Sequence, residues 1–388
     1  MTSTTSSLEL GDVVRRFGPA FLSAHGERLM PSQRKALQDI ASCHTADRGG
    51  HRYHCEACGR EFWIYHGCGN RSCPSCHTRA MREWIEQREE QMLGCRYFHV
   101  VATVPESLRA AFLAHQKLLY GLLMKTVASC VLDLARDPKF LGATPAILAV
   151  LHTWNFDLDC HPHVHLLVSA GGVSDDGRQW IEPRSPKWLL PNRALSKLVR
   201  RRFRAHLREA APEIFAQIDA AVWNQGWNSF CKWYGKRAKS VLHYLGRYVY
   251  RVAITNHRLL AMDETHVTFR CKKNKEKRWR TMRLPGEEFL RRFIMHVLPR
   301  GFHKVRYYGL WHHSRRESRN RIRLLLAPPI DISPLQPVLH AFPREDQATP
   351  LAAADLNPPE NTPYLPACPD CKSRQVRLLE IQVHNRSP

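Results

Sequence analysis

The sequence has little that would suit a membrane or a secretory route. No hydrophobic run approaches the roughly 20 residues of a membrane span, and the best one, Pro145–Leu151, has the length of a strand. The first residues, MTSTTSSLELGDVVRR, have neither the charged start nor the apolar core of a secretory signal. Internal repeats are also lacking. We therefore expect a cytoplasmic protein with no membrane partner.

Acidic residues are scarce relative to basic ones. The 388 residues include 35 Asp and Glu against 58 Lys and Arg, which gives a net charge of +23. Such an excess repels itself in the compact state and usually reflects a polyanionic partner. Hydrophobic residues make up 44% of the chain, which is enough for a buried core. This charge balance favours a protein that binds nucleic acid over a basic protein that does not.

Composition divides the chain into three predicted domains. Residues 1–95 contain a cluster of cysteines and histidines, and residues 96–327 alternate apolar runs with basic helical stretches. Residues 328–388 are rich in proline, which predicts an extended, partly disordered tail.

Within the middle domain, periodicity predicts both strands and helices. Arg96–Val104 is β-branched and aromatic, which predicts a strand. Ala146–Phe156 and His163–Ala170 are apolar runs joined by a short polar link, which predicts a β-hairpin. Helical spacing predicts a helix over Glu106–Leu134, between the first strand and the hairpin, and further helix over Asn192–Tyr250. The predicted fold is α+β, with a largely antiparallel sheet and flanking helices preceded by a small zinc-binding domain.

Cysteine spacing predicts a zinc site. Of the 13 cysteines, six lie between Cys43 and Cys76, which indicates metal ligation and not a disulfide framework. Two Cys-x2-Cys pairs can each form a tight turn, and together they supply the four sulfurs that Zn²⁺ prefers at about 2.3 Å. The predicted ligands of this structural zinc are Cys55, Cys58, Cys73 and Cys76.

Other cysteines and histidines extend this cluster. Cys43, His51 and Cys68 are candidate ligands of a further zinc, although Cys43 and Cys68 are equally consistent with small buried side chains. The remote pair Cys368-x2-Cys371 offers only two ligands, so the sequence assigns it no function.

The segment CHPHVHLLV predicts a second kind of metal site. Side chains at i and i+2 of a strand share a face, so His163 and His165 point the same way while Val164 enters the core. His152 lies on the partner strand of the predicted hairpin and can face this pair. Three imidazoles with open coordination positions suit a divalent cation, and a phosphodiester substrate would favour Mg²⁺ or Mn²⁺. Each histidine taken singly is more often a surface or satisfied polar residue.

The segment HYLGRYVYR contributes a pair of tyrosines. Tyr244 and Tyr248 are spaced i, i+4, so on a helix they share one face. Nearby cations, Arg247 among them, would favour the phenolate that a nucleophile requires. Attack on phosphorus would leave a 5′-phosphotyrosine and a free 3′-hydroxyl. The spacing alone is also typical of a packing stripe of aromatic side chains.

Two basic runs predict contacts with phosphates. Lys187–Arg208 has eight Lys and Arg without an acid, and Arg270–Arg283 has eight with one Glu. Such runs make nucleic-acid binding strongly salt-dependent. The candidate DNA-binding residues are Arg200, Arg201, Arg202, Arg247, Lys272 and Lys273.

Taken together, these motifs resemble a known family. HTWNFDLDCHPHVHLLVSAGG followed by HYLGRYVYRVAITNHRL resembles the two-tyrosine HUH transposases of the insertion sequence 91 family. ASCHTADRGGHRYHCEACG with CGNRSCPSCH is similar to that family's N-terminal zinc-binding domain, and EEFLRRFIMHVLPRGFHKVRYYGLW to its C-terminal region. The likeness covers roughly Leu37 to Trp311, in the family's order.

The resemblance implies an HUH endonuclease fold and rolling-circle transposition, in which one strand at a transposon end is nicked and transferred and host replication completes the process. It implies that His163 and His165 are the HUH metal ligands and that Tyr244 and Tyr248 are the nucleophiles. His152 resembles the third histidine of the related conjugative relaxases. A location at the bacterial nucleoid follows from this activity.

Two other functions fit the same motifs. A plasmid relaxase or replication initiator would use the same chemistry, although the chain has no GxxxxGK phosphate-binding loop of a fused helicase. A zinc-dependent DNA-binding protein without catalysis is the other, disfavoured because His163, His165, Tyr244 and Tyr248 are all in place.

Overall fold

The computed structural model describes residues 8–76, 81, 83–87, 91–185, 189–234, 249, 252–272, 278–326 and 365–383. The chain forms two compact units, which we call the core unit (residues 1–43 and 67–327) and the ribbon unit (residues 44–66 and 328–388). These units differ from the predicted domains 1–95, 96–327 and 328–388. The difference arises because residues 49–55 pair with the C-terminal strand and because the first helices pack with residues far along the chain.

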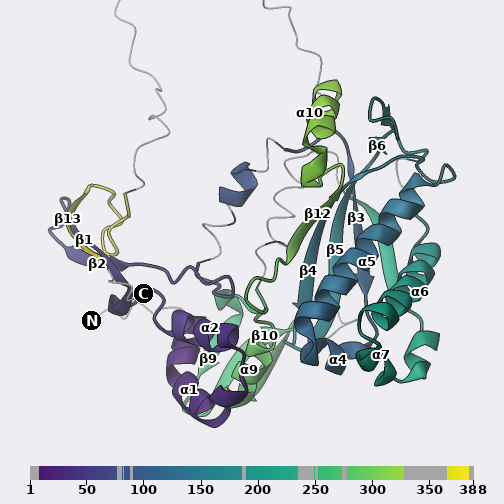
Figure 1. The fold of residues 1–388 in the computed structure, drawn as a ribbon. Helices are drawn as coiled ribbons and strands as arrows, with labels where there is room; N and C mark the ends of the chain where they lie inside the picture. The colour runs from purple at the N-terminus through teal and green to yellow at the C-terminus, as the bar shows by residue number, and fades with distance from the viewer. Residues whose placement is uncertain are drawn as a thin grey trace, which may run out of the picture. The chain divides into compact units, whose positions relative to one another are not determined.

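A five-stranded sheet forms the centre of the core unit (Figure 1). Each strand is antiparallel to its neighbours, which confirms the predicted α+β class with an antiparallel sheet. The strand order is β12 (Val305–Gly309), β4 (Ala146–Trp154), β5 (Cys160–Ser169), β3 (Tyr97–Thr103) and β8 (Asn228–Tyr234).

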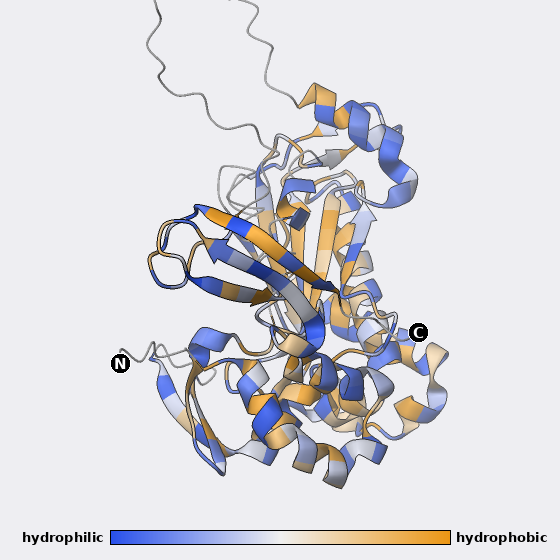
Figure 2. Ribbon diagram, turned by 90° about the vertical axis from the view of Figure 1, so that its left-hand side faces the viewer, coloured by the Kyte–Doolittle hydropathy of each residue, from blue (hydrophilic) through white to orange (hydrophobic). Residues whose placement is uncertain are grey.

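Two helices cover one face of this sheet, α5 (Gln116–Arg136) and α6 (Asn192–Ala210) (Figure 1). Apolar residues of α5 recur at a spacing of four, as in Leu119, Leu123 and Val127, and they are fully buried against the sheet. The central strands are predominantly hydrophobic (Figure 2). Alternate residues of β5, such as Val164 and Leu166, enter this core, so His163 and His165 occupy the opposite face.

Of the described helices, α5 alone has the length and hydropathy of a membrane span. Most of its apolar residues are buried in the core unit against the sheet and α6, which accounts for its composition.

Strand β8 departs from the prediction of helix over Asn192–Tyr250. Helix does form in α6, but Asn228–Tyr234 is an edge strand that pairs with β3 from Thr103↔Asn228 to Tyr97↔Tyr234. The segment NSFCKWY has the aromatic content that suits a strand, and β3 supplies the backbone partners. Its partner is remote in sequence, so local helical spacing did not reveal it.

In a second layer of the core unit, the N-terminal helices pack with apolar residues in the range 253–297. Helices α1 (Leu10–His25) and α2 (Pro31–Ala41) share a hydrophobic cluster with α9 (Gly286–Ile294). The three-stranded sheet β9 (Leu259–Met262), β10 (His266–Cys271) and β11 (Arg280–Pro285) contributes to the same cluster. A Cβ at Gly286 would collide with the ring of Phe17, so α1 lies close against the start of α9.

The ribbon unit is a small antiparallel sheet in the order β13 (Val376–Val383), β1 (Gly49–Cys55) and β2 (Glu61–Tyr65). Part of the predicted tail is therefore a strand. Shorter elements of the core unit include α4 (Arg109–Ala114), α7 (Pro212–Ala216), α10 (Arg316–Leu325), β6 (Gly172–Val173) and β7 (Trp180–Ile181).

Candidate functional site

Three histidines meet on the face of the five-stranded sheet opposite α5 and α6. His152 on β4 pairs directly with His163 on β5, and His165 follows two residues later on the same face. One ring nitrogen from each of the three lies within 4.8 Å of the others, which is the spacing of ligands around one cation. His152 is buried, whereas His163 and His165 are half-buried, so the cluster is reachable from one side.

Hydrogen bonds orient two of these rings. The Nδ1 of His163 lies 2.6 Å from the carbonyl oxygen of His161. A carbonyl only accepts, so Nδ1 carries the proton and the lone pair of Nε2 is left for a cation. The Nδ1 of His165 lies 2.8 Å from the Nε2 of His99 on β3. With Nδ1 of His165 as the donor, its Nε2 is left for a cation in the same way.

His99 is a site residue that sequence reasoning missed. It is buried, and its ring lies nearly in the plane of the His165 ring, with 5° between the planes and 5.1 Å between centroids. Burial lowers the pKa of His99 to about 4, so the ring is neutral near pH 7 and its Nε2 can accept a hydrogen bond from His165. The only signal in the sequence is its place on Arg96–Val104, where a single histidine among apolar residues is more often a satisfied core residue.

His296 steadies the hairpin that carries the cluster. Its Nε2 donates to the carbonyl oxygen of Leu158 at 3.0 Å, and the hydroxyl of Thr153 donates to its Nδ1 at 3.2 Å. Burial lowers the pKa of His296 to about 4, which keeps the ring in this neutral form. Because Thr153 adjoins His152, the hydrogen bond limits movement of this strand.

An exposed aromatic side chain lies beside the histidines. Phe230 on β8 pairs with Val101 of β3, and its ring centroid lies 5.8 Å from that of His99. Phe230 is nevertheless 43% exposed, and Lys232, which pairs with His99, is exposed as well. An open aromatic ring and a cation therefore lie at the border of the cluster.

The predicted phosphate-binding residues differ in their surroundings. Arg202 forms an ion pair with Asp133 of α5 at 2.6 Å, so it ties two helices together instead of standing on an open surface. Arg200 donates to the carbonyl oxygen of Gln225 at 3.0 Å, and Arg201 is exposed. Arg200 and Arg201 line a shallow basic depression on α6, and Lys272 is half-buried at the end of β10. Lys273 and Arg247 lie outside the described residues.

The predicted nucleophiles Tyr244 and Tyr248 also lie outside the described residues. Their neighbour Val249 is described, and it is helical and 3% exposed. Val249 is buried in the same hydrophobic cluster as Leu148 and Leu167, which lie on the histidine face of the sheet. The residue after Tyr248 is thus anchored on the face that carries His163 and His165.

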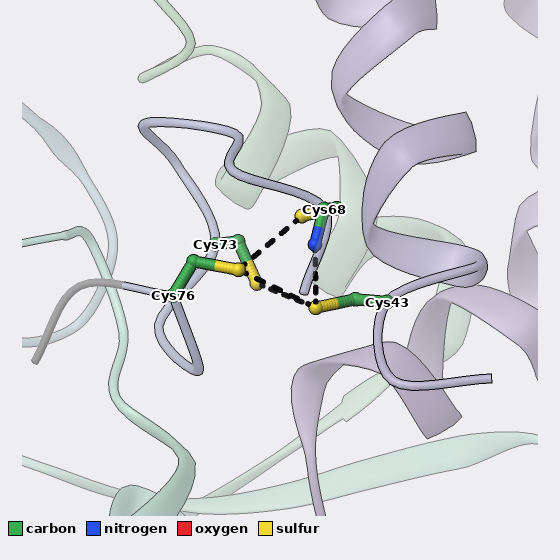
Figure 3. Close-up of side chains that lie close together, drawn as sticks. All are labelled: Cys43, Cys68, Cys73 and Cys76. Carbon is green, nitrogen blue, oxygen red and sulfur yellow. Dashed lines mark hydrogen bonds between the residues drawn. The ribbon is translucent and has the colours of Figure 1, made fainter. Parts of the chain in front are cut away.

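Four cysteines form the metal cluster of the core unit, which we call the knuckle cluster. Cys43, Cys68, Cys73 and Cys76 point their sulfurs toward one another (Figure 3). Three of the Sγ–Sγ distances are 3.5, 3.6 and 3.7 Å. Sulfurs at about 2.3 Å from a tetrahedral zinc are about 3.8 Å apart, so the set fits this ion. Backbone amides of Cys68 and Gly69 donate to the sulfurs of Cys43 and Cys76.

The grouping of the predicted zinc ligands is therefore corrected. Cys73 and Cys76 form a four-cysteine set with Cys43 and Cys68. Cys55 and Cys58 form a separate set with Cys368 and Cys371 in the ribbon unit. His51 belongs to neither set, since its Nδ1 lies 3.3 Å from the hydroxyl of Tyr53. The two Cys-x2-Cys pairs are alike in sequence, and only the tertiary fold decides which further cysteines join each of them.

Arg71 ties the knuckle cluster to the rest of the core unit. It lies between Cys68 and Cys73, and its guanidinium donates to the carbonyl oxygens of Leu298, Pro299 and Phe302 at 2.7–2.8 Å. Burial lowers the pKa of Arg71 from its ordinary value, but the group keeps its charge near neutral pH. The loop before β12 is thus held by a residue whose position depends on the cysteines around it.

Comparison with known proteins gives two family matches. Residues 146–319 match the family model described as "Putative transposase", and residues 13–104 match the model of the IS91 "Transposase zinc-binding domain". No solved structure gives a significant match.

Two curated relatives bear on the whole chain. "Putative transposase y4qJ" of Sinorhizobium fredii is 36% identical over 97% of this chain and 96% of its own length. "Transposase for insertion sequence element IS801" of Pseudomonas savastanoi pv. phaseolicola is 26% identical over 71% of this chain and 69% of its own length. The histidine cluster and the knuckle cluster both lie within the matched regions.

Proposed function

Since the chain belongs to the IS91 family of transposases and has that family's N-terminal zinc-binding domain, we propose that it is an HUH endonuclease that cuts and rejoins single-stranded DNA in rolling-circle transposition. The observation that carries the proposal is the cluster of His152, His163 and His165 on one face of the sheet. Val249 adds to it, because this neighbour of the tyrosine pair is buried on the same face.

The histidine cluster fits a divalent cation. His163 and His165 are both oriented through Nδ1, which leaves their Nε2 atoms for the ion, and His152 supplies the third nitrogen. Mg²⁺ or Mn²⁺ bound there would polarise the scissile phosphate and stabilise charge on the leaving 3′ oxygen. Three imidazoles would hold the ion and would leave other coordination positions for phosphate oxygens. Cys43, Cys68, Cys73 and Cys76, in contrast, form a closed set that suits structural zinc.

The tyrosines supply the nucleophile. The phenol of Tyr244 or Tyr248 gives up its proton and its oxygen forms a bond to phosphorus, the bond from phosphorus to the 3′ oxygen breaks, and that oxygen takes a proton to become a free 3′-hydroxyl. The 5′-phosphotyrosine conserves the energy of the phosphodiester for rejoining. A second tyrosine permits a second cleavage while the first strand is still attached.

Several features of the surface suit single-stranded DNA at a transposon end. Phe230 offers an open ring for a base beside the histidines, and Lys232 and Arg201 are exposed cations. Host replication would fill the strand that transfer leaves single, which places the enzyme with the nucleoid in the bacterial cytoplasm.

The first prediction tests the nucleophile. The double variant Tyr244→Phe, Tyr248→Phe is expected to form no covalent protein–DNA adduct, because phenylalanine keeps the ring and lacks the hydroxyl. Wild type and variant are incubated with Mn²⁺ and a labelled single-stranded oligonucleotide that carries the transposon end, and the products are separated on a denaturing protein gel. The two single variants show which tyrosine attacks first.

Binding of the same oligonucleotide, measured in parallel, is the control and should be unchanged in the double variant. An adduct that persists in the double variant would refute the assignment of the tyrosines. Cleavage by the wild type without an adduct would indicate a nuclease that activates water. Binding without cleavage would indicate a zinc-dependent DNA-binding protein.

The second prediction concerns Phe230. The variant Phe230→Ala is expected to weaken single-stranded DNA binding by about 5- to 150-fold, because stacking of one base on an aromatic side chain contributes about 1–3 kcal/mol. Fluorescence anisotropy with a short oligonucleotide measures the affinity at fixed salt. Phe230→Trp should keep the affinity, since it keeps an aromatic face. Equal binding by Phe230→Ala and wild type would exclude a base on this ring.

A further inference from the structure

We propose that the chain binds a second structural zinc ion in the ribbon unit, through Cys55, Cys58, Cys368 and Cys371, and that its C-terminal segment folds by closing this site. The family match to the zinc-binding domain covers residues 13–104 and the transposase match covers 146–319, so Cys368 and Cys371 lie outside both. The proposal does not depend on the nuclease mechanism.

The four sulfurs have the spacing of a tetrahedral zinc site. Cys55 and Cys371 are 3.5 Å apart at Sγ, and Cys58 and Cys368 are 3.7 Å apart. All four sulfurs lie within 4.8 Å of one another, and sulfurs around zinc are about 3.8 Å apart. A disulfide would bring two of them to about 2.05 Å, and all four thiols are free.

The two Cys-x2-Cys turns have the same backbone structure. In the first, the amide of Cys55 donates to the carbonyl of Arg60, and the amide of Gly59 donates back to the carbonyl of Cys55, both at 2.8 Å. The second repeats this pattern: the amide of Cys368 donates to Ser373 at 2.8 Å, and that of Lys372 to Cys368 at 3.1 Å. Two equivalent turns facing each other form the ligand set of a zinc ribbon.

The backbone conformation of Lys372 shows that the second turn has the same geometry as the first. The residue that follows the second cysteine has a positive φ in both turns, +75° at Gly59 and 61° at Lys372. Glycine adopts this conformation freely, whereas a lysine adopts it only where the surrounding structure requires it. The turn at Cys368–Cys371 is therefore built as a counterpart of the turn at Cys55–Cys58.

Further contacts join the two segments that supply the ligands. Strand β13 pairs with β1 from Cys55↔Val376 to Gly49↔Val383. Arg60 forms an ion pair with Asp370 at 3.0 Å, and Arg52 forms one with Glu380 at 3.1 Å. The hydrophobic cluster beneath is small, with Cys55, Cys368 and Val376 as its buried members. The described part of the ribbon unit has so small a core that a bound metal ion would add substantially to its stability.

The metal content of the full chain tests this proposal. We expect two zinc ions per wild-type chain, one for each cysteine cluster, measured by elemental analysis after anaerobic gel filtration. The variant Cys368→Ser, Cys371→Ser should keep one. The variant Cys55→Ser, Cys58→Ser should also keep one zinc ion. The variant with all four substitutions should still keep one, because all four residues bind the same ion. Cys95→Ser, Cys231→Ser, outside both clusters, is the matched control and should keep two.

Cobalt substitution gives a second readout. Tetrahedral thiolate sites bind Co²⁺ with strong visible absorption, so the wild type should show twice the absorbance of the Cys368→Ser, Cys371→Ser variant. Retention of the knuckle cluster ion by the variants shows that the core unit is folded. One zinc in the wild type, or two in the Cys368→Ser, Cys371→Ser variant, would overturn the proposal.

Discussion

Replacing His163 by alanine is expected to lower the rate of strand cleavage by at least about a thousandfold, because in the proposed mechanism the variant loses a ligand of the catalytic cation. A bound metal contributes several kcal/mol of transition-state stabilisation, and each 1.36 kcal/mol is a factor of ten in rate. His163 pairs with His152 and lies two residues from His165, so it supplies one of the three grouped ring nitrogens. Cleavage of a labelled oligonucleotide under single-turnover conditions measures the loss.

Alanine variants of His99 and His206 serve as comparisons for the loss of cleavage in His163→Ala. His99→Ala should lower cleavage by about 10- to 100-fold, as is usual when the hydrogen-bond partner of a metal ligand is removed, and added Mn²⁺ should restore part of it. His206 lies on α6, bonded to Thr126 at 2.9 Å, and His206→Ala should cleave as the wild type does. Full activity of His163→Ala at low Mn²⁺ would show that the cluster does not hold the catalytic ion.

Replacing Cys73 by serine is expected to unfold the layer of the core unit that contains α1, α2 and α9. Cys73 is 1% exposed and belongs to the hydrophobic cluster formed by these helices. A structural zinc contributes apparent free energies of about 10–16 kcal/mol, which is comparable to the whole stability of a domain, about 5–15 kcal/mol. The bonds from Arg71 to the carbonyls of Leu298 and Phe302 would be lost with the turn. Thermal unfolding and zinc content measure the effect together.

Cys271 is the matched control for this prediction. It is also buried in this hydrophobic cluster, at 3% exposure, but it lies on β10 outside both metal clusters. Cys271→Ser should keep all zinc and lose about 1–3 kcal/mol, the cost of a buried hydroxyl. If Cys73→Ser were no less stable than Cys271→Ser, or kept its zinc, the knuckle cluster would not be a structural metal site.

The sequence predicted the parts of the site that depend on local geometry. His152, His163 and His165 lie on one hairpin, where the alternation of a strand determines which side chains share a face. The antiparallel sheet was predictable for the same reason. His99 was missed because it joins the site from β3, through a pairing that residue spacing does not encode.

Remote partners limited the remaining predictions. Cys55 lies next to Cys371, 316 residues away in sequence, and Cys43 lies next to Cys76, so the choice among similar cysteine pairs depends on the tertiary fold. Arg202 was grouped with the DNA-binding residues by the charge of its helix, yet its partner is Asp133 on another helix. Charge and spacing identify candidate residues, but packing decides which of them face solvent.

In the proposed mechanism, cleavage links the DNA to tyrosine through its 5′ phosphate. The most direct test uses a single-stranded oligonucleotide with different dyes on the two sides of the scissile bond, incubated with the wild type and Mn²⁺ and separated under denaturing conditions. We predict that the protein retains the dye on the 3′ side, and that the released fragment ends in a 3′-hydroxyl that a polymerase can extend. Retention of the 5′-side dye, or release of both fragments without an adduct, would show that the protein does not form a 5′-phosphotyrosine.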